Sequence, residues 1–207
     1  MTRTVTDAPA GDRDTTCITG ARRCRDEYPR QLAHLPLGVG AGVLILVLPL
    51  GLPAAILAGA LLVGFLVSDA LVGVPSDASR SGRFVGTFIR ARETPGGGAN
   101  YTGLSLLAAL LLFPASSAAA ATIAFGVLDS VSTIAGLRYG RHRLPNGKSI
   151  EGTLAAFAFT TPFLLLFLTP VAAVAVAFVG ALAELVLPVN DNLIVPFLLA
   201  LLVTAFV

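Results

Sequence analysis

Five carboxylic acids lie within or directly beside long apolar stretches of this sequence, where an ionised side chain is costly and therefore points to chemistry. They are Asp69, Asp129, Glu151, Glu184 and Asp191. Asp129 is the most deeply placed. On a helix it shares one face with Ser132, Thr133 and Gly136. The small residues of that face also suit close helix packing, a structural alternative that leaves the carboxylate unexplained.

The segment 138–152 combines a turn signal with basic residues and is a candidate anion site. Pro145-Asn146-Gly147 predicts a turn. Lys148 and Ser149 then begin the next helix, with Ser149 as its N-cap. Free N–H groups at a helix N-terminus beside basic side chains suit a phosphate, although a basic loop can also serve only to set topology. The basic residues of this segment are Arg138, Arg141, Arg143 and Lys148.

Carboxylates beside such a loop suit a metal-bound polyphosphate. Acidic side chains can hold Mg²⁺, while basic groups neutralise the phosphate oxygens. The residues alone predict this chemistry and leave the second substrate open, a lipid head group being one option.

The elements that carry these residues are apolar enough for a bilayer. The chain has 207 residues, of which 55% are hydrophobic and 13% are charged, and soluble domains carry about 25% charged residues. Apolar runs occupy 35–50, 53–74, 101–113, 117–137, 153–168, 171–187 and 193–207. We therefore predict an all-α, polytopic transmembrane helical bundle of about seven spans, in which 101–113 is the shortest.

Charge asymmetry predicts the orientation of this bundle. All 14 Lys and Arg residues fall in the N-terminal tail, in 75–100 and in 138–151. Seven crossings place these three segments on one side, which the positive-inside bias assigns to the cytoplasm. The prediction is a multi-pass cell-membrane protein whose N-terminus and candidate site are cytoplasmic.

The chain divides into a tail and one larger unit. We predict a disordered, basic cytoplasmic tail over 1–30 and a transmembrane domain over 31–207. Cys17 and Cys24 lack the spacing of a zinc site or a redox pair. The formal net charge of +2 gives no sign of a nucleic-acid partner.

Short motifs spread over 30–196 resemble a family of membrane lipid kinases, namely the dolichol kinase, phytol kinase and CTP-dependent diacylglycerol kinase (polyprenol kinase) family. The most specific is the run from Asp129 through Gly136 and Gly140 to Lys148-Ser-Ile-Glu-Gly-Thr153. The other segments that resemble the family are Arg30-Gln-Leu-Ala-His34, Arg92-Glu93, Gly98-Ala-Asn-Tyr101, Glu184, Pro188-Val-Asn-Asp-Asn192 and Pro196.

The resemblance implies phosphoryl transfer from CTP to the hydroxyl of a membrane lipid alcohol, with Mg²⁺ as cofactor. It implies that the nucleotide and the metal are bound among six residues, namely Asp129, Lys148, Ser149, Glu151, Asp191 and Asn192. Asp129 and Asp191 would bind Mg²⁺, and Lys148 with Arg141 or Arg143 would neutralise the CTP phosphates. Glu184 or Asp129 would accept the proton of the lipid hydroxyl.

The chain departs from the family pattern at several positions. Leu128 replaces the glycine before the aspartate, Gln31 replaces the usual lysine, and no arginine directly follows Asp69. Two other interpretations also remain open. One is a CTP-dependent cytidylyltransferase that makes a CDP-lipid, and the other is a transporter, whose site would lie near the midplane of the bilayer.

Overall fold

The computed structural model describes residues 13–49, 51–71, 97–187 and 191–207, and within these ranges it is a helical protein. Each apolar stretch predicted from the sequence falls in one helix, including 101–113. The helices are α1 (Arg13–Val47), α2 (Gly51–Leu71), α4 (Gly97–Leu112), α5 (Ala115–Tyr139), α6 (Ile150–Leu164), α7 (Pro170–Val186) and α8 (Asp191–Phe206). The all-α prediction is confirmed.

The first helix begins earlier than the sequence analysis expected. Residues 13–30 were predicted to belong to a disordered tail, whereas α1 starts at Arg13 and runs without interruption to Val47. The sequence is compatible with an exposed helix, because Arg22 and Arg23 each precede an acidic residue by four positions. The sequence analysis interpreted the alternating charges as a sign of disorder, although they are equally compatible with a helix.

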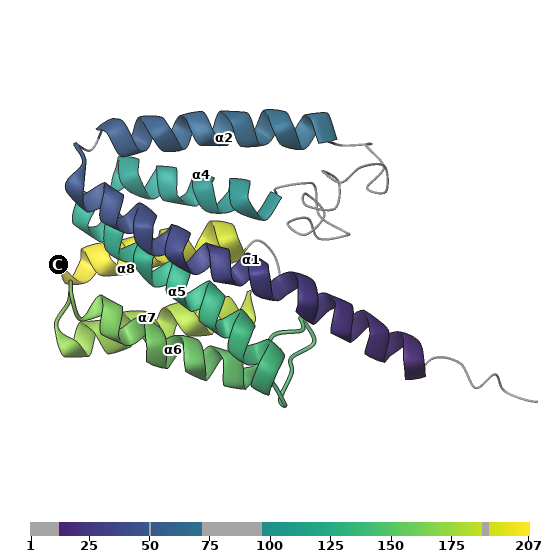
Figure 1. The fold of residues 1–207 in the computed structure, drawn as a ribbon. Coiled ribbons are helices and arrows are strands. Elements are labelled where there is room, and N and C mark those ends of the chain that lie inside the picture. The colour runs from purple at the N-terminus through teal and green to yellow at the C-terminus, as the bar shows by residue number, and fades with distance from the viewer. Residues whose placement is uncertain (1–12, 50, 72–96, 188–190) are drawn as a thin grey trace, which may run out of the picture.

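Helix α5 is the centre of the fold (Figure 1). It packs against α1, α6 and α8, while α4 packs against α2 and α8, and α7 against α6 and α8. Residues Ala118–Ala121 are all buried, and four successive residues go once around a helix. Alanine side chains are small, so neighbouring helices can approach α5 from every direction.

The helices run back and forth, which brings distant loops to one end of the bundle. Figure 1 shows the connection from α5 to α6, the end of α7 and the starts of α8 and α4 at the same end. The C-terminal residue of the chain lies at the opposite end. The basic segment 138–152 is therefore beside the C-terminal end of α7 and the N-terminal end of α8.

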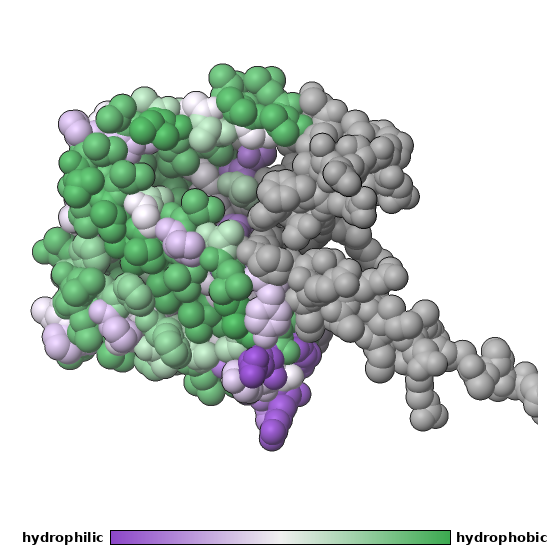
Figure 2. Space-filling view, in the orientation of Figure 1, coloured by the Kyte–Doolittle hydropathy of each residue, from purple (hydrophilic) through white to green (hydrophobic). Residues whose placement is uncertain are grey.

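Much of the surface is apolar. Figure 2 shows hydrophobic residues over most of the visible face, with the most hydrophilic ones near the α5–α6 connection. Large hydrophobic side chains are exposed on every helix described, among them Leu66, Leu111, Phe159 and Val171 at 61–82% exposure. In the described part of the chain, α5 is long and apolar enough to cross a membrane, and 78% of its apolar window is buried. The other apolar helices or helix segments there span 10–17 residues.

Helices α1 and α5 cross with their backbones in contact, and this close crossing predicts a large effect of Gly126→Ala. A Cβ atom at Gly126 would lie 2.9 Å from Gly38 Cα and 3.4 Å from the Gly38 carbonyl carbon. These are backbone atoms that cannot rotate away, so the helices must separate. We expect Gly126→Ala to lower the free energy of unfolding by about 1–3 kcal/mol, measured by chemical or thermal unfolding of the purified protein.

Gly59→Ala is the matched control, because a Cβ atom there has nothing within 4 Å. It reports only the gain in helix propensity, which is about 1 kcal/mol. Equal stabilisation by the two substitutions would contradict the close α1–α5 crossing.

Candidate active site

The N-terminus of α6 has the cap that the sequence predicted. The Ser149 side chain accepts a hydrogen bond of 3.1 Å from the Gly152 N–H, and Ser149 itself has the extended backbone of an N-cap residue. Ser149 is 4% exposed. Its hydroxyl therefore caps the N-terminus of α6. This cap fixes the position of Lys148, which directly precedes Ser149 at the end of the loop.

The loop before Ser149 is a tight hairpin, as Pro145-Asn146-Gly147 indicated. The Gly147 N–H donates to the Leu144 carbonyl and the Leu144 N–H donates to the Lys148 carbonyl, both at 2.8 Å. Gly147 has φ +85°, a left-handed conformation that side chains disfavour. The hairpin folds back toward α7, where the Asn146 amide donates to the Leu185 carbonyl at 2.8 Å.

Lys148 is held by two acids that follow it by 36 and 43 residues. Its ammonium nitrogen Nζ lies 3.0 Å from Glu184 Oε1 and 2.6 Å from Asp191 Oδ2. It also donates to the backbone carbonyl of Glu184. We call Lys148, Glu184, Asp191 and Ser132 the Lys148 cluster. One ammonium thus joins the α5–α6 loop, the end of α7 and the start of α8.

Ser132 connects this cluster to Asp129 of α5. The Ser132 hydroxyl lies 3.3 Å from Glu184 Oε1 and donates at 3.1 Å to the backbone carbonyl of Asp129. Asp129 is half-buried and close enough to Glu184 for their carboxylates to interact electrostatically. Two of the predicted acids, Glu184 and Asp191, therefore contact one lysine, and Asp129 lies near Glu184.

Helix α8 begins at this cluster and is tied to α4. Asp191 Oδ1 accepts a hydrogen bond of 2.9 Å from the Asn192 N–H, so one carboxylate oxygen faces its own helix start and the other faces Lys148. The Asn192 amide donates to the Gly98 carbonyl at 3.5 Å. This contact joins two segments that the sequence analysis named independently.

Lys148 remains charged over the whole pH range of ordinary assays. Burial disfavours its ammonium form, but the negative charges of Glu184 and Asp191 outweigh burial and raise the pKa of Lys148 above 10.5. A permanently charged ammonium suits the binding of phosphate oxygens and excludes Lys148 as a base near neutral pH.

Other predicted nucleotide ligands make contacts within the loop instead. Glu151 Oε1 lies 2.6 Å from His142 Nδ1 and also accepts from the His142 N–H. Arg143 donates to the Gly136 and Gly147 carbonyls at 2.7 and 3.1 Å, where it satisfies the end of α5. Arg141 is exposed. Glu151 and Arg143 thus brace the hairpin that presents Lys148.

The Asp129 helix face also has the structural role considered from the sequence. A Cβ atom at Gly136 would lie 2.9 Å from Ser149 Oγ, and one at Gly152 would lie 3.1 Å from the Gly136 N. Helices α5 and α6 therefore touch through these glycines. The sequence analysis missed the Asn146 contact with α7, because a Pro-Asn-Gly turn explains an asparagine without any distant partner.

The cation held by the cluster is the Lys148 ammonium. Glu184 and Asp191 both contact this one positive charge, and Asp129 lies near Glu184. Carboxylate oxygens are the type of ligand that Mg²⁺ requires. Among the described residues, no group of three or more His, Cys, Asp or Glu side chains could hold a metal ion. Mg²⁺ usually takes one or two carboxylates and completes its shell with substrate phosphates and water, so the donor set fits that use.

Some predicted features fall outside the described residues. Arg92, Glu93 and Pro188 lie in segments that the structure does not describe, and so does the side chain of Asp69 near the end of α2. Comparisons with family models, curated proteins and solved structures find no match to this chain. The assignment of function therefore rests on the chain's own residues.

Proposed function

We propose that this protein is a membrane-embedded kinase that transfers the γ-phosphoryl group of CTP to the hydroxyl of a lipid alcohol. The observation that carries the proposal is the Lys148 cluster, in which a half-buried cation and converging carboxylates lie at one end of a bundle with an apolar surface. The motif resemblance supplies the nucleotide and the class of acceptor.

A bilayer location explains the surface better than water does. Monomeric soluble proteins rarely expose contiguous apolar patches larger than a few hundred Å². Exposed Leu, Val, Ile and Phe side chains cover α1, α2, α7 and α8 of this protein. We propose that the described helices cross the membrane as a multi-pass bundle, with the Lys148 cluster on the cytoplasmic side.

The cluster can support phosphoryl transfer by positioning and charge. A divalent cation would neutralise part of the negative charge of the acids that hold Lys148. The Lys148 ammonium would then be able to bind phosphate oxygens of CTP. Mg²⁺ held by Asp129 and Asp191 would supply neutralisation of the phosphates. This combination is what a loose phosphoryl transition state requires.

The transfer itself forms one bond and breaks one. The lipid oxygen bonds to the γ-phosphorus, and the bond from that phosphorus to the β-phosphate oxygen breaks, which leaves CDP. Glu184, at 5% exposure, or Asp129 accepts the hydroxyl proton. Both carboxylates are placed by helices, so neither needs a flexible loop to reach the acceptor.

The decisive experiment follows the label from CTP. Membranes that carry the protein are given CTP labelled at either the γ- or the α-phosphate. We expect label in the lipid fraction from the γ position only, and its dependence on Mg²⁺ is measured in parallel. Label from the α position would identify a cytidylyltransferase instead. No label from either, with folded protein present, would contradict an enzyme of this class and favour a transporter.

A further inference from the structure

Exposed basic and aromatic side chains surround the end of α5. Arg138 Nε donates at 3.1 Å to the hydroxyl of Tyr139, and the Arg138 guanidinium carbon lies 5.7 Å from the centre of the Tyr139 ring. Arg141 follows two residues later, and its guanidinium forms no hydrogen bond or ion pair with the described residues. All three residues are exposed, and we call them the basic rim. The positive charges of the rim therefore face the surroundings of the protein.

The basic rim adjoins the apolar surface of α6. The Ile150 N–H donates at 3.0 Å to the His142 carbonyl, so the backbone next to Arg141 lies against the first residue of α6. Ile150 and Leu154 are exposed, and a spacing of four residues places them on one face of the helix. Figure 2 shows the most hydrophilic residues next to a large hydrophobic area. The charged groups therefore begin where the apolar surface ends.

The tyrosines lie at the same end of the bundle. The chain has three, namely Tyr28, Tyr101 and Tyr139. Tyr28 is close enough to Arg138 for the two side chains to interact electrostatically, and Tyr101 lies near the start of α4. Figure 1 shows the start of α4 at the end of the bundle where α5 ends. Tyrosine is enriched where the hydrocarbon of a bilayer meets the head groups, so this end of the bundle fits the head-group region.

Negatively charged head groups complement the basic rim. Glu151 is the one acid in the segment 138–151, and its carboxylate binds His142 at 2.6 Å. Among the described residues, no acid forms an ion pair with Arg138 or Arg141. Each basic residue near the surface of an anionic membrane strengthens its binding about fivefold. Two arginines with uncompensated charge are therefore sufficient to select anionic lipids.

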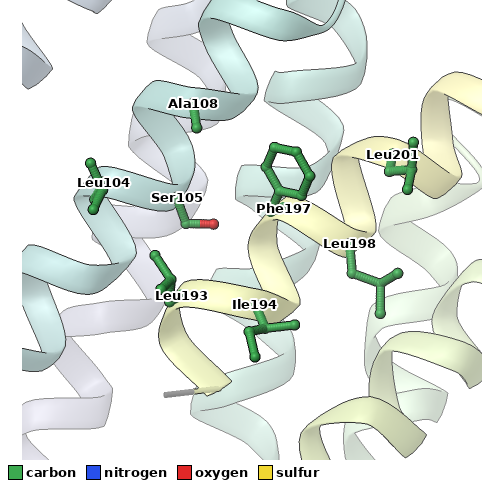
Figure 3. A pocket seen from close by; sticks show the side chains of 8 residues that line it. All are labelled: Leu104, Ser105, Ala108, Leu193, Ile194, Phe197, Leu198 and Leu201. Atoms are coloured by element: carbon green, nitrogen blue, oxygen red, sulfur yellow. The ribbon is translucent and has the colours of Figure 1, made fainter.

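The pocket between α4 and α8 offers no such charge. It is lined by seven apolar residues and Ser105 (Figure 3). Leu201 belongs to this lining and is exposed. Because none of the lining residues is charged, a lipid chain at this pocket is not selected by the charge of its head group. The pocket therefore provides a comparison for the rim.

We propose that the basic rim binds anionic phospholipid head groups of the cytoplasmic leaflet. Arg138 and Arg141 bind the phosphates, and Tyr139 lies at the boundary with the hydrocarbon. The proposal rests on the proposed bilayer location of the bundle and does not depend on transfer from CTP. Since the rim begins the hairpin that presents Lys148, bound lipid would hold that hairpin from outside.

The chain contains no tryptophan, so a single introduced tryptophan reports on its own surroundings. Tyr139→Trp places this fluorophore in the rim, and Leu201→Trp places it in the α4–α8 pocket. The purified full-length protein is reconstituted in vesicles of equal parts phosphatidylcholine and phosphatidylglycerol, with bromine on the chains of either one lipid or the other. Bromine quenches tryptophan on contact. We expect quenching to show an enrichment of phosphatidylglycerol of about fivefold in Tyr139→Trp and none in Leu201→Trp.

Two charge variants in the Tyr139→Trp background locate the binding. Arg138→Gln/Arg141→Gln removes the charges and should reduce the enrichment to about twofold or less. Arg138→Lys/Arg141→Lys keeps the charges and should retain most of it. Raising the salt concentration from about 0.1 M to 1 M shortens the Debye length from about 10 Å to 3 Å and should also weaken the enrichment. Monodisperse elution before reconstitution checks that each variant folds.

Each contrary result overturns a stated part of the proposal. Equal quenching by the two lipids in Tyr139→Trp rejects head-group binding and leaves the bilayer location intact, whereas no quenching in either reporter rejects the bilayer location. Quenching in Leu201→Trp alone places the rim outside the head-group region. An enrichment that persists in Arg138→Gln/Arg141→Gln rejects the role of these arginines.

A further competition separates lipid head groups from soluble anions. Millimolar inorganic phosphate at constant ionic strength should leave the enrichment unchanged. Its loss would identify the rim as a site for soluble phosphates and reject the lipid surface. Enrichment as expected without γ-phosphate transfer from CTP would reject the kinase and leave the head-group surface intact.

Discussion

Lys148→Met is expected to abolish transfer from CTP and also to lower the free energy of unfolding by about 3 kcal/mol. Removing one partner of a buried ion pair costs about 3–5 kcal/mol, because the other charge is left without compensation. The low end applies here, since the side chains of Lys148 and Asp191 retain 22% and 29% exposure. Glu184, whose side chain is 7% exposed, is the group left in an unfavourable environment.

Loss of activity in that variant could follow from poor folding alone, and a second substitution separates the two effects. Lys148→Met/Glu184→Gln removes the uncompensated charge, so we expect it to recover most of the lost stability. The Glu184→Gln single variant measures what loss of this carboxylate costs in activity, and the double variant should be less active still, because the phosphates of CTP lack their ammonium. The measurements are unfolding free energies for the wild type, both single variants and the double variant, with transfer assays on the same samples.

Lys148→Arg is a further control that keeps the positive charge. Because guanidinium differs in shape from ammonium, we expect this variant to keep part of the wild-type unfolding free energy and to transfer phosphate from CTP much more slowly. An active double variant would show that Lys148 serves only to hold α7 and α8 together.

Local features of this site were predictable from the sequence. The Pro145-Asn146-Gly147 turn and the Ser149 cap depend on neighbouring residues, and both have the expected form. The helices followed from the length and composition of the apolar stretches, which also depend on sequence nearby. The early start of α1 at Arg13 was missed, because charged residues there suit an exposed helix as well as an unstructured tail.

For residues far apart in the sequence, only the common location of the charged side chains could be predicted, and their individual contacts could not. The sequence placed Lys148, Glu184 and Asp191 on one side, but it did not show that Lys148 binds both acids. That detail depends on how α7 and α8 pack against the end of α5. Glu151 and Arg143 illustrate the same limit: both carry charges suited to a nucleotide, and both are bound to their own loop.

Asp129 is the strongest candidate for a functional role among the acids, because its charge lies within a helix and close to a second carboxylate. It lies in α5 near Glu184, and two carboxylates at short range repel each other. A neutral residue at this position would remove that repulsion. Such an unfavourable arrangement is typical of functional sites, where stability is lower than the fold permits.

Asp129→Asn is therefore expected to lower activity far more than stability. The substitution keeps the shape of the side chain and removes a charge needed for Mg²⁺, so transfer from CTP should fall about 100-fold or more. The free energy of unfolding should change much less than in Lys148→Met, because asparagine keeps the polar side chain and repulsion with Glu184 is relieved. Ser130→Ala is the matched control: Ser130 is buried beside Asp129 and its hydroxyl has no hydrogen-bond partner in the part of the chain that the structure describes, so activity should persist. Full activity of Asp129→Asn, or a stability loss as large as that of Lys148→Met, would mean that Asp129 belongs to the packing of α5 and that the metal is held elsewhere.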